Sequence, residues 1–298
     1  MRNKLDFRSL VRPHETQQGQ ALSLLELVES FSRRTLSNAD QRLGKFTVVW
    51  GGESAWAITP DQLEAVTDAM ICNGYSVATA NRDISTLGTI YRWARDQRLT
   101  PRGFRSPTLG VKRFEEPIRR VEISSDQIQA LRSAALTATR DRRFGCFIAL
   151  LVDTGARRSE VLDRRWSEVD LDAGMILCPT TKTGIPRILH FRPETASLLR
   201  RVYPHRSPET LLFEGRVPGR SADWRRPWSR ITHEVGIPDL HLHDLRHAAA
   251  ARLLRAGVTV GVAAQVLGHS VQVLARRYGH LETATLRQAQ ELAWQTQT

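Results

Sequence analysis

Helix-breaking residues crowd into one short stretch of the chain: Pro101, Gly103, Pro107, Gly110 and Pro117. Proline removes a backbone donor and clashes with the preceding turn, while glycine makes helix formation entropically costly. Because no regular helix can run through this stretch, the 298 residues should fold as two blocks of ordinary domain size. We predict an N-terminal arm over residues 1–20, a helical domain over 21–112, a linker over 113–120 and a second domain over 121–298.

The first block has the periodicity of amphipathic helices. Apolar residues recur at helical spacing from Leu22 to Phe31, which predicts a first helix. Thr59 and Gln62 form a capping box around Pro60, so a second helix should begin there and end before Gly74. A longer helix capped by Ser76 follows, and its apolar positions step by three and four: Val77, Ala80, Ile84, Leu87, Tyr91 and Ala94.

The second block mixes helices with short strands. Ser124 and Gln127 form another capping box, and residues 144–153 read as a core helix that ends at Thr154-Gly155. Residues 169–171 and 175–178 predict a hairpin, and a third strand is expected over 187–191. Further helices are expected at about 194–202, 224–235, 244–256, 260–267, 271–278 and 284–295. The fold class is therefore mainly α with a small antiparallel β-sheet.

The charge of the chain points to a polyanionic partner, most often nucleic acid. Lys and Arg number 43 against 31 Asp and Glu, a net charge of +12. Between Arg82 and Arg113 the only acidic residues are Asp83 and Asp96, whereas a solvated helix face normally mixes its signs. A phosphate-facing surface is one explanation, and simple solubility is the other. The candidate DNA contacts are Arg82, Arg92, Arg95, Arg98, Lys112 and Arg113.

Several other classes of protein do not fit this sequence. No apolar run approaches the roughly 18 residues of a membrane span, so no membrane partner is expected, and the N-terminus lacks the apolar core of an export signal. Three cysteines are too few and too far apart for a disulfide framework or a zinc knuckle. Because Cys72 and Cys146 stand in apolar helical contexts, we predict buried thiols in a reducing cytoplasm.

Four short motifs in the second block carry candidate chemistry. In chain order they are residues 154–160 (TGARRSE), Lys182 in a β-turn, residues 243–247 (HDLRH), and residues 267–270 (LGHS) with Tyr278 downstream. Each alone has an ordinary explanation, such as a surface charge, a capping pair or a packed tyrosine. His243 and His247 have the four-residue spacing of zinc helices, but no Glu lies between them and no third ligand is evident. We therefore predict no metal and no cofactor.

Together, in this order and spacing, the motifs resemble the boxes of the tyrosine recombinase (phage integrase) family. TGARRSEVL is similar to the first arginine box, TTKTGIPR to the β-hairpin lysine turn, HLHDLRH to the His-x-x-Arg box, and LGHSVQVLARRYGH to the histidine-to-tyrosine box. In the first block, SVATANRDISTLGTIYRWA resembles, more loosely, the helical SAM-like core-binding domain of these enzymes. Ser106-Pro107 stands where Asn-Pro is usual.

The resemblance implies a site-specific recombinase that cuts and rejoins duplex DNA without metal or ATP. Tyr278 is then the nucleophile that forms a 3′-phosphotyrosyl bond, and Lys182 is the general acid for the 5′ oxygen. Arg157 and Arg246 correspond to the phosphate-binding arginines, and their planar forks suit two phosphate oxygens. The remaining members, His243 and His269, would bind phosphate oxygens or move the nucleophile's proton.

The family also implies partners and a location. These are double-stranded DNA with inverted-repeat core sites, a homotetramer on synapsed DNA, accessory DNA-bending proteins, and a cytoplasmic location on the nucleoid. The segment after Tyr278 would hold a helix, about 284–295, that docks on a neighbouring protomer. Three alternatives remain open: a catalytically silent DNA-binding relative, a type IB topoisomerase with similar chemistry, and a metal-dependent nuclease, which would need a carboxylate cluster that we do not find.

Overall fold

The computed structural model describes residues 22–116, 122–138, 141–179, 186–278 and 290–291. By its internal contacts the chain divides into two compact units, residues 1–119 and 120–298, and each is described by itself. The predicted arm and part of the predicted linker lie outside the described residues, as does Lys182. Of the predicted helix 284–295, only residues 290–291 are described.

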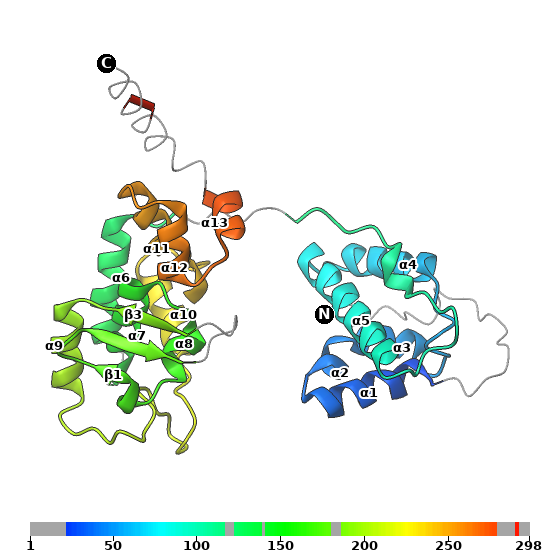
Figure 1. The fold of residues 1–298 in the computed structure, drawn as a ribbon, viewed down its shortest axis with the longest axis horizontal. Coiled ribbons are helices and arrows are strands. Elements are labelled where there is room, and N and C mark those ends of the chain that lie inside the picture. The colour runs from blue at the N-terminus through cyan, green and yellow to red at the C-terminus, as the bar shows by residue number, and fades with distance from the viewer. Residues whose placement is uncertain (1–21, 117–121, 139–140, 180–185, 279–289, 292–298) are drawn as a thin grey trace. The chain divides into compact units, whose positions relative to one another are not determined.

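The first unit is built from helices, drawn blue to cyan in Figure 1. The capping boxes at Ser23 and Thr59 and the side-chain cap at Ser76 start three of them, and the latter two caps are the predicted ones. A buried cluster that includes Leu27, Trp50 and Ile84 holds the helices together. The elements are α1 (Leu24–Thr35), α2 (Ala39–Arg42), α3 (Gly44–Trp50), α4 (Pro60–Cys72), α5 (Val77–Asp96) and the short 3-10 helix η2 (Pro107–Leu109).

Helices α2 and α3 are not predicted by the sequence patterns. Both helices are short, four and seven residues, and neither has a side-chain cap at its first turn. Leu43, Phe46 and Trp50 nevertheless stand three and four residues apart, and all three are fully buried. Their burial in the core of the first unit, where both helices contact α1, therefore explains why these turns are helical, rather than a local start signal.

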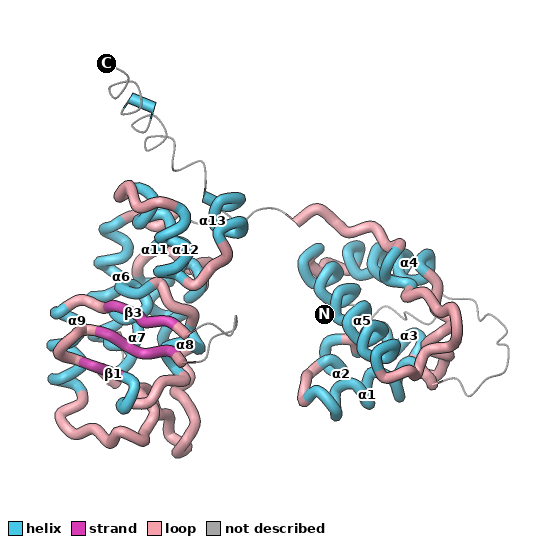
Figure 2. The backbone as a smooth tube through the Cα atoms, in the orientation of Figure 1, coloured by secondary structure: helices cyan, strands magenta, loops and turns pink. Residues whose placement is uncertain are grey.

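The second unit combines helices with one small sheet (Figure 2). Its helices begin with α6 (Ser125–Thr137), which has the predicted capping box at Ser124. They continue with α7 (Arg143–Thr154), α8 (Arg158–Leu162), the 3-10 helix η3 (Trp166–Glu168), α9 (Pro193–Val202), α10 (Arg225–Glu234), α11 (Leu242–Arg255), α12 (Val260–Leu267) and α13 (Val271–Tyr278). The predicted fold class, mainly α with a small antiparallel sheet, is confirmed.

The sheet has three antiparallel strands in the order β1 (Val169–Asp170), β2 (Met175–Cys178) and β3 (Arg187–His190). Cys178 pairs with Arg187, which fixes the register of β2 and β3. Because side chains alternate between the two faces, Ile176 and Leu189 enter the core while Leu177 stays exposed. The register also puts Arg187 at the start of β3, where its side chain turns toward α8.

Helix α7 is the central element of the second unit and lies behind the sheet in Figure 1. It is buried almost throughout, from Phe144 to Val152, because it packs against α6, α9, α11 and β3. It ends at Gly155, whose φ of +59° is a left-handed conformation that favours glycine. A second apolar cluster joins α11, α12 and α13 and includes the partly buried ring of Tyr278.

The described residues test two predictions, the burial of the cysteines and the absence of a membrane-spanning helix. Cys146 and Cys178 are buried, but Cys72 is exposed, so its predicted burial is wrong. Cys72, the last residue of α4, follows the buried Met70 by two residues, which is about 200° around the helix, and so it lies on the side away from the core. In the ranges that the structure covers, none of the helices has the length and apolar character needed to cross a bilayer.

Gly155 offers a test of how tightly the junction of α7, α11 and α12 is packed. A Cβ added at Gly155 would lie 2.6 Å from Leu267 Cδ2 and 2.7 Å from Ala249 Cβ. Gly257 has a φ of +81° and no atom within 4 Å of such a Cβ, so it provides the matched control. We expect Gly257→Ala to cost about 1 kcal/mol, the price of backbone strain alone.

We expect Gly155→Ala to cost about 3 kcal/mol, because steric overlap adds to the same strain. Urea denaturation of both variants measures the two free energies of unfolding. Equal costs would contradict close packing at this junction.

Candidate active site

The structure brings five of the six predicted catalytic residues to one region of the second unit. Arg157 stands at the start of α8, His243 and Arg246 lie on α11, His269 follows α12, and Tyr278 ends α13. The main-chain carbonyl of Gly268 links two of these elements, since it accepts hydrogen bonds from Arg157 Nη2 at 2.8 Å and Arg246 Nη2 at 3.3 Å. The sixth residue, Lys182, lies outside the described residues.

Glu160 organises the arginines of this region. Its side chain is only 4% exposed, and one oxygen accepts from Arg157 Nη1 at 2.7 Å. The other oxygen accepts from Arg187 Nη2 at 2.7 Å and from the Arg157 backbone N–H at 2.8 Å. Burial alone would raise the pKa of Glu160, but these N–H and guanidinium groups lower it below its ordinary value of 4.5. The carboxylate is therefore ionised and holds Arg157 in place.

Arg246 is the most deeply buried charged group of the site. Its side chain is 1% exposed, and Nη1 donates to the Gly155 carbonyl at 3.0 Å. Burial lowers the pKa of Arg246 to about 9, with further contributions from the charges of Arg157 and Arg187. Arg157 and Arg187 pair with Glu160 at 2.7 Å, and Arg246 Nη1 lies 4.0 Å from the same carboxylate, so the cluster has excess positive charge. Such an arrangement suits an anion with several oxygens, such as a phosphodiester.

His269 has one nitrogen occupied and one available. Its Nε2 accepts from Arg246 Nε at 2.9 Å, so the proton of the neutral ring is on Nδ1. Burial, together with the charges of Arg246 and Arg157, lowers the pKa of His269 to about 3, which keeps the ring neutral. The buried Nδ1 has no hydrogen-bond partner among the described residues. It is therefore a donor that a ligand oxygen could satisfy.

His243 borders an open surface pocket next to the arginine cluster. The pocket has a volume of about 480 Å³, and its lining includes Arg157, Ser159 and His243. Desolvation lowers the pKa of His243 below 6.5, and the charge of Arg246 acts in the same direction. His243 is exposed, so its ring can reach a ligand in the pocket.

Tyr278 meets a residue that the sequence analysis did not assign to the site. Its phenol oxygen contacts His247 Nδ1, with the ring centroids 6.1 Å apart. Burial raises the pKa of Tyr278, while the charge of Arg277 lowers it. The phenol is therefore protonated in this state, and its nearest acceptor is the neutral imidazole of His247.

His247 and Arg187 are the two site residues that sequence reasoning missed. His247 follows His243 by one helical turn on α11, and the two rings lie edge to face at 4.9 Å. That spacing was considered only as a zinc signal. Within the described ranges, however, the His, Cys, Asp and Glu side chains form no group of three or more that could hold a metal ion. Arg187 closes the quoted motif TTKTGIPR, but its role could not be read from it, because its partners Glu160 and Val266 are distant in sequence.

The six candidate DNA contacts all lie exposed in the first unit, in two groups. Arg82, Lys112 and Arg113 lie near the start of α5, where Arg113 Nη1 donates to the Asn81 carbonyl at 2.8 Å. The second group stands about ten residues further along α5, which corresponds to roughly 15 Å of helix. Its members are Arg92 and Arg95 on α5, and Arg98 just after the helix ends.

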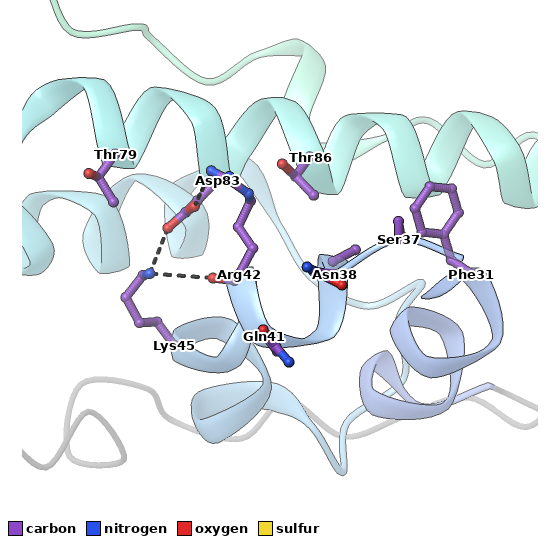
Figure 3. Close-up of a pocket in the computed structure, with 10 residues that line it drawn as sticks. Phe31, Ser37, Asn38, Gln41, Arg42, Lys45, Thr79, Asp83 and Thr86 are labelled. Atoms are coloured by element: carbon purple, nitrogen blue, oxygen red, sulfur yellow. Dashed lines mark hydrogen bonds and ion pairs between the residues drawn. The ribbon is translucent and has the colours of Figure 1, made fainter. Parts of the chain in front are cut away.

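A polar pocket of about 590 Å³ lies beside the start of α5 in the same unit (Figure 3). Asp83, only 1% exposed, points into it and pairs with Lys45 Nζ at 2.8 Å. Arg42 Nη1 lies 3.9 Å from the same carboxylate. Lys45 and Arg42 therefore neutralise the buried carboxylate of Asp83. Arg82 and Arg92 are instead exposed on α5.

Two family models match the chain. The model of the phage integrase family matches residues 122–285, more than half of the chain. The model of the phage integrase N-terminal SAM-like domain matches residues 22–98. The two matches therefore fall on the two compact units.

One curated relative is the tyrosine recombinase XerA of Saccharolobus solfataricus. It is 34% identical over 171 residues, which cover 57% of this chain and 56% of the relative. The chain spans about half the length of several curated relatives that it matches.

The fold is similar to solved integrase structures. The Tn1549 transposon integrase, in complex with transposon right end DNA, has a TM-score of 0.70 at 16% identity, covering 90% of this chain and 98% of that one. A lambda integrase tetramer bound to a Holliday junction has a TM-score of 0.63 at 17% identity, covering 86% and 78%. At these identities the likeness concerns the fold.

The role of Glu160 can be tested by the pH dependence of stability. We expect Glu160→Gln to cost about 3 kcal/mol at pH 7, because the buried guanidinium groups lose their anionic partner. Since the pKa of Glu160 is lower in the folded state, its contribution is present above its unfolded pKa of about 4.5 and is lost as the pH falls through the lower folded value. Urea denaturation at pH 7 and pH 3.5 should therefore give a smaller cost at pH 3.5.

Glu234→Gln is the control, since Glu234 is exposed on α10. A Glu160→Gln cost that is the same at both pH values would argue against an ionised carboxylate at the centre of the cluster.

Proposed function

The chain belongs to the phage integrase family, and from that premise we propose that it is a site-specific DNA recombinase that cuts and rejoins duplex DNA. The observation that carries this proposal is the convergence of Arg157, Arg246 and His269 on one site that also holds Tyr278. A phosphodiester bound there would meet two guanidinium groups and the free Nδ1–H of His269. Tyr278 supplies the nucleophile on the neighbouring element.

The proposed reaction proceeds in two reversible steps. Tyr278 Oη attacks the scissile phosphorus, and a 3′-phosphotyrosyl bond forms as the bond to the 5′ oxygen breaks. Arg157 and Arg246 balance the charge that accumulates on the non-bridging oxygens. We assign Lys182 as the acid that protonates the departing 5′ oxygen. The freed 5′-hydroxyl of a partner strand then attacks the phosphotyrosine, so the bond is conserved without ATP.

We further propose that both units contact the DNA. The first unit, residues 21–112, would hold phosphates through the exposed arginines of α5, and residues 113–120 would connect it to the catalytic unit, 121–298. By analogy with the lambda integrase tetramer, we expect four protomers on two inverted-repeat core sites. The helix expected at 284–295 would dock on a neighbouring protomer. Because its substrate is DNA, we expect the protein on the nucleoid in the cytoplasm, where accessory DNA-bending proteins can take part.

The nucleophile assignment is tested by replacing one oxygen atom. Wild-type protein is incubated with a pool of nicked duplexes of random sequence, and DNA that stays attached in denaturing detergent is recovered and sequenced. On a duplex selected in this way, we expect Tyr278→Phe to bind within about twofold of wild type and to form no covalent adduct. Tyr203→Phe is the control, since Tyr203 packs in the core against Trp166. Adduct formation by Tyr278→Phe would refute the assignment.

The DNA-contact assignment is tested by charge removal on α5. Each phosphate contact adds about 0.9 to the slope of log affinity against log salt concentration, because counterions are released. We therefore expect the double variant Arg82→Gln, Arg92→Gln to lower the slope by about 2 and to weaken binding of any duplex. The double variant Arg33→Gln, Arg34→Gln removes the same charge from exposed positions on α1. Equal losses in the two double variants would exclude a specific contact face on α5.

A further inference from the structure

We propose that His247 is the group that takes the phenol proton of Tyr278 during DNA cleavage and returns it during rejoining. The inference rests on the proposed function, since it concerns the reaction assigned there. It starts from one contact: the Tyr278 phenol oxygen lies against His247 Nδ1, across the interface of α11 and α13. Leu274 of α13 is fully buried in the cluster that joins these helices, so packing holds the two rings together.

The protonation states of Tyr278 and His247 decide which of the two donates the hydrogen bond. The charged and titratable groups around His247 are Arg277 on α13, and His243, Asp244 and Arg246 on α11. Burial and the positive charges of Arg277 and Arg246 lower the pKa of His247 to about 4, although the negative charge of Asp244 acts to raise it. His247 is therefore neutral near pH 7. Its Nδ1 then accepts the hydrogen bond from the phenol, and its other nitrogen, Nε2, carries the ring proton.

The other histidines of the site are placed for different tasks. His269 already accepts from Arg246 through Nε2 and presents a proton on Nδ1, so it can donate to a phosphate oxygen. His243 lines the pocket next to Arg157. Among the described residues, the side-chain hydrogen bond of the Tyr278 oxygen is made to His247. His247 is thus the base that already touches the atom that must lose a proton.

Binding of DNA should raise the pKa of His247 and so make it a better proton acceptor. The arginines of the site outnumber their one carboxylate, Glu160, and the positive charges near His247 disfavour a protonated imidazole. A phosphodiester between Arg157 and Arg246 adds a negative charge, which raises the pKa of His247. The proton acceptor is therefore weak in the free protein and becomes stronger once substrate is in place.

The step balances in atoms and electrons. The Oη–H bond of Tyr278 breaks, its proton moves to His247 Nδ1, and an electron pair on Oη forms the bond to phosphorus. The bond from phosphorus to the 5′ oxygen breaks with its electron pair, and that oxygen takes a proton from the acid assigned as Lys182. In the reverse step the phosphotyrosyl bond breaks and His247 returns its proton to Oη, as microscopic reversibility requires.

The test measures single-turnover adduct formation on the duplex selected with wild-type protein, in two chemical versions. In one, the bridging 5′ oxygen at the scissile bond is replaced by sulfur, which leaves without help from an acid. His247→Asn keeps an acceptor oxygen near the position of Nδ1 but cannot bind a proton near neutral pH. His233→Asn, at an exposed position on α10, is the matched control.

We expect His247→Asn to slow adduct formation by about 100-fold at pH 7, with DNA affinity unchanged. The rate should rise about tenfold per pH unit as phenolate forms without a base. The sulfur-containing duplex should not restore the rate, because the defect lies on the tyrosine side of phosphorus. In His247→Gly, added imidazole should restore part of the rate of adduct formation. This second variant tests the proposal even if His247→Asn does not fold.

Three results would overturn the inference. They are a rate for His247→Asn within threefold of the His233→Asn control, full rescue by the sulfur-containing duplex, and a His247→Gly variant that is slow but unresponsive to imidazole. Wild-type protein that forms no adduct would instead contradict the proposed recombinase function, so the two failures can be told apart.

Discussion

The ion pairs of Glu160 are the interaction on which the candidate site depends. A buried carboxylate is costly unless it is fully hydrogen-bonded, and here two guanidinium groups and a backbone N–H meet it. Because Arg157 comes from the start of α8 and Arg187 from the start of β3, this one carboxylate fixes the sheet against α8. The same pairs hold the positive charges of Arg157 and Arg187 close together, and a phosphate bound as we propose would relieve their repulsion.

Backbone carbonyls complete the arrangement. Arg246 is buried and donates to the carbonyls of Gly155 and Gly268, which close α7 and α12 in left-handed conformations. Each glycine also stands where a side chain would collide, Gly155 with Leu267 and Gly268 with Arg187. The turns that end these helices are therefore part of the site, because they aim main-chain oxygens at the arginines and leave space for them.

Much of this arrangement could be predicted from the sequence. The caps at Thr59, Ser76 and Ser124, the hairpin and the fold class follow from local patterns, and the structure confirms them. The short helices α2 and α3 could not be predicted in this way, since burial of Leu43, Phe46 and Trp50 stabilises them rather than a cap. The predicted burial of Cys72 is wrong because it rests on apolar neighbours in the sequence, whereas helical spacing puts Cys72 on the side of α4 opposite the buried Met70.

The residues of the candidate site also differ in whether local sequence patterns could identify them. Sequence motifs identify Arg157, Arg246, His269 and Tyr278 as site residues. The roles of Arg187 and His247 depend instead on contacts with residues 27 and 31 positions away. A sequence pattern could show His247 one turn after His243, but not that the Tyr278 oxygen would meet its ring. Such contacts depend on how α11, α12 and α13 pack, which only the three-dimensional arrangement reveals.

The central claim is that DNA becomes attached to Tyr278. Mass spectrometry of the trypsin-digested, nuclease-trimmed adduct tests it most directly. Because Arg277 and Arg287 flank the segment, trypsin should release the peptide of residues 278–287. The account predicts that this peptide carries the nucleotide mass, linked through a 3′-phosphate on Tyr278. A nucleotide on any other residue, such as Tyr203 in the peptide of residues 202–206, would contradict it.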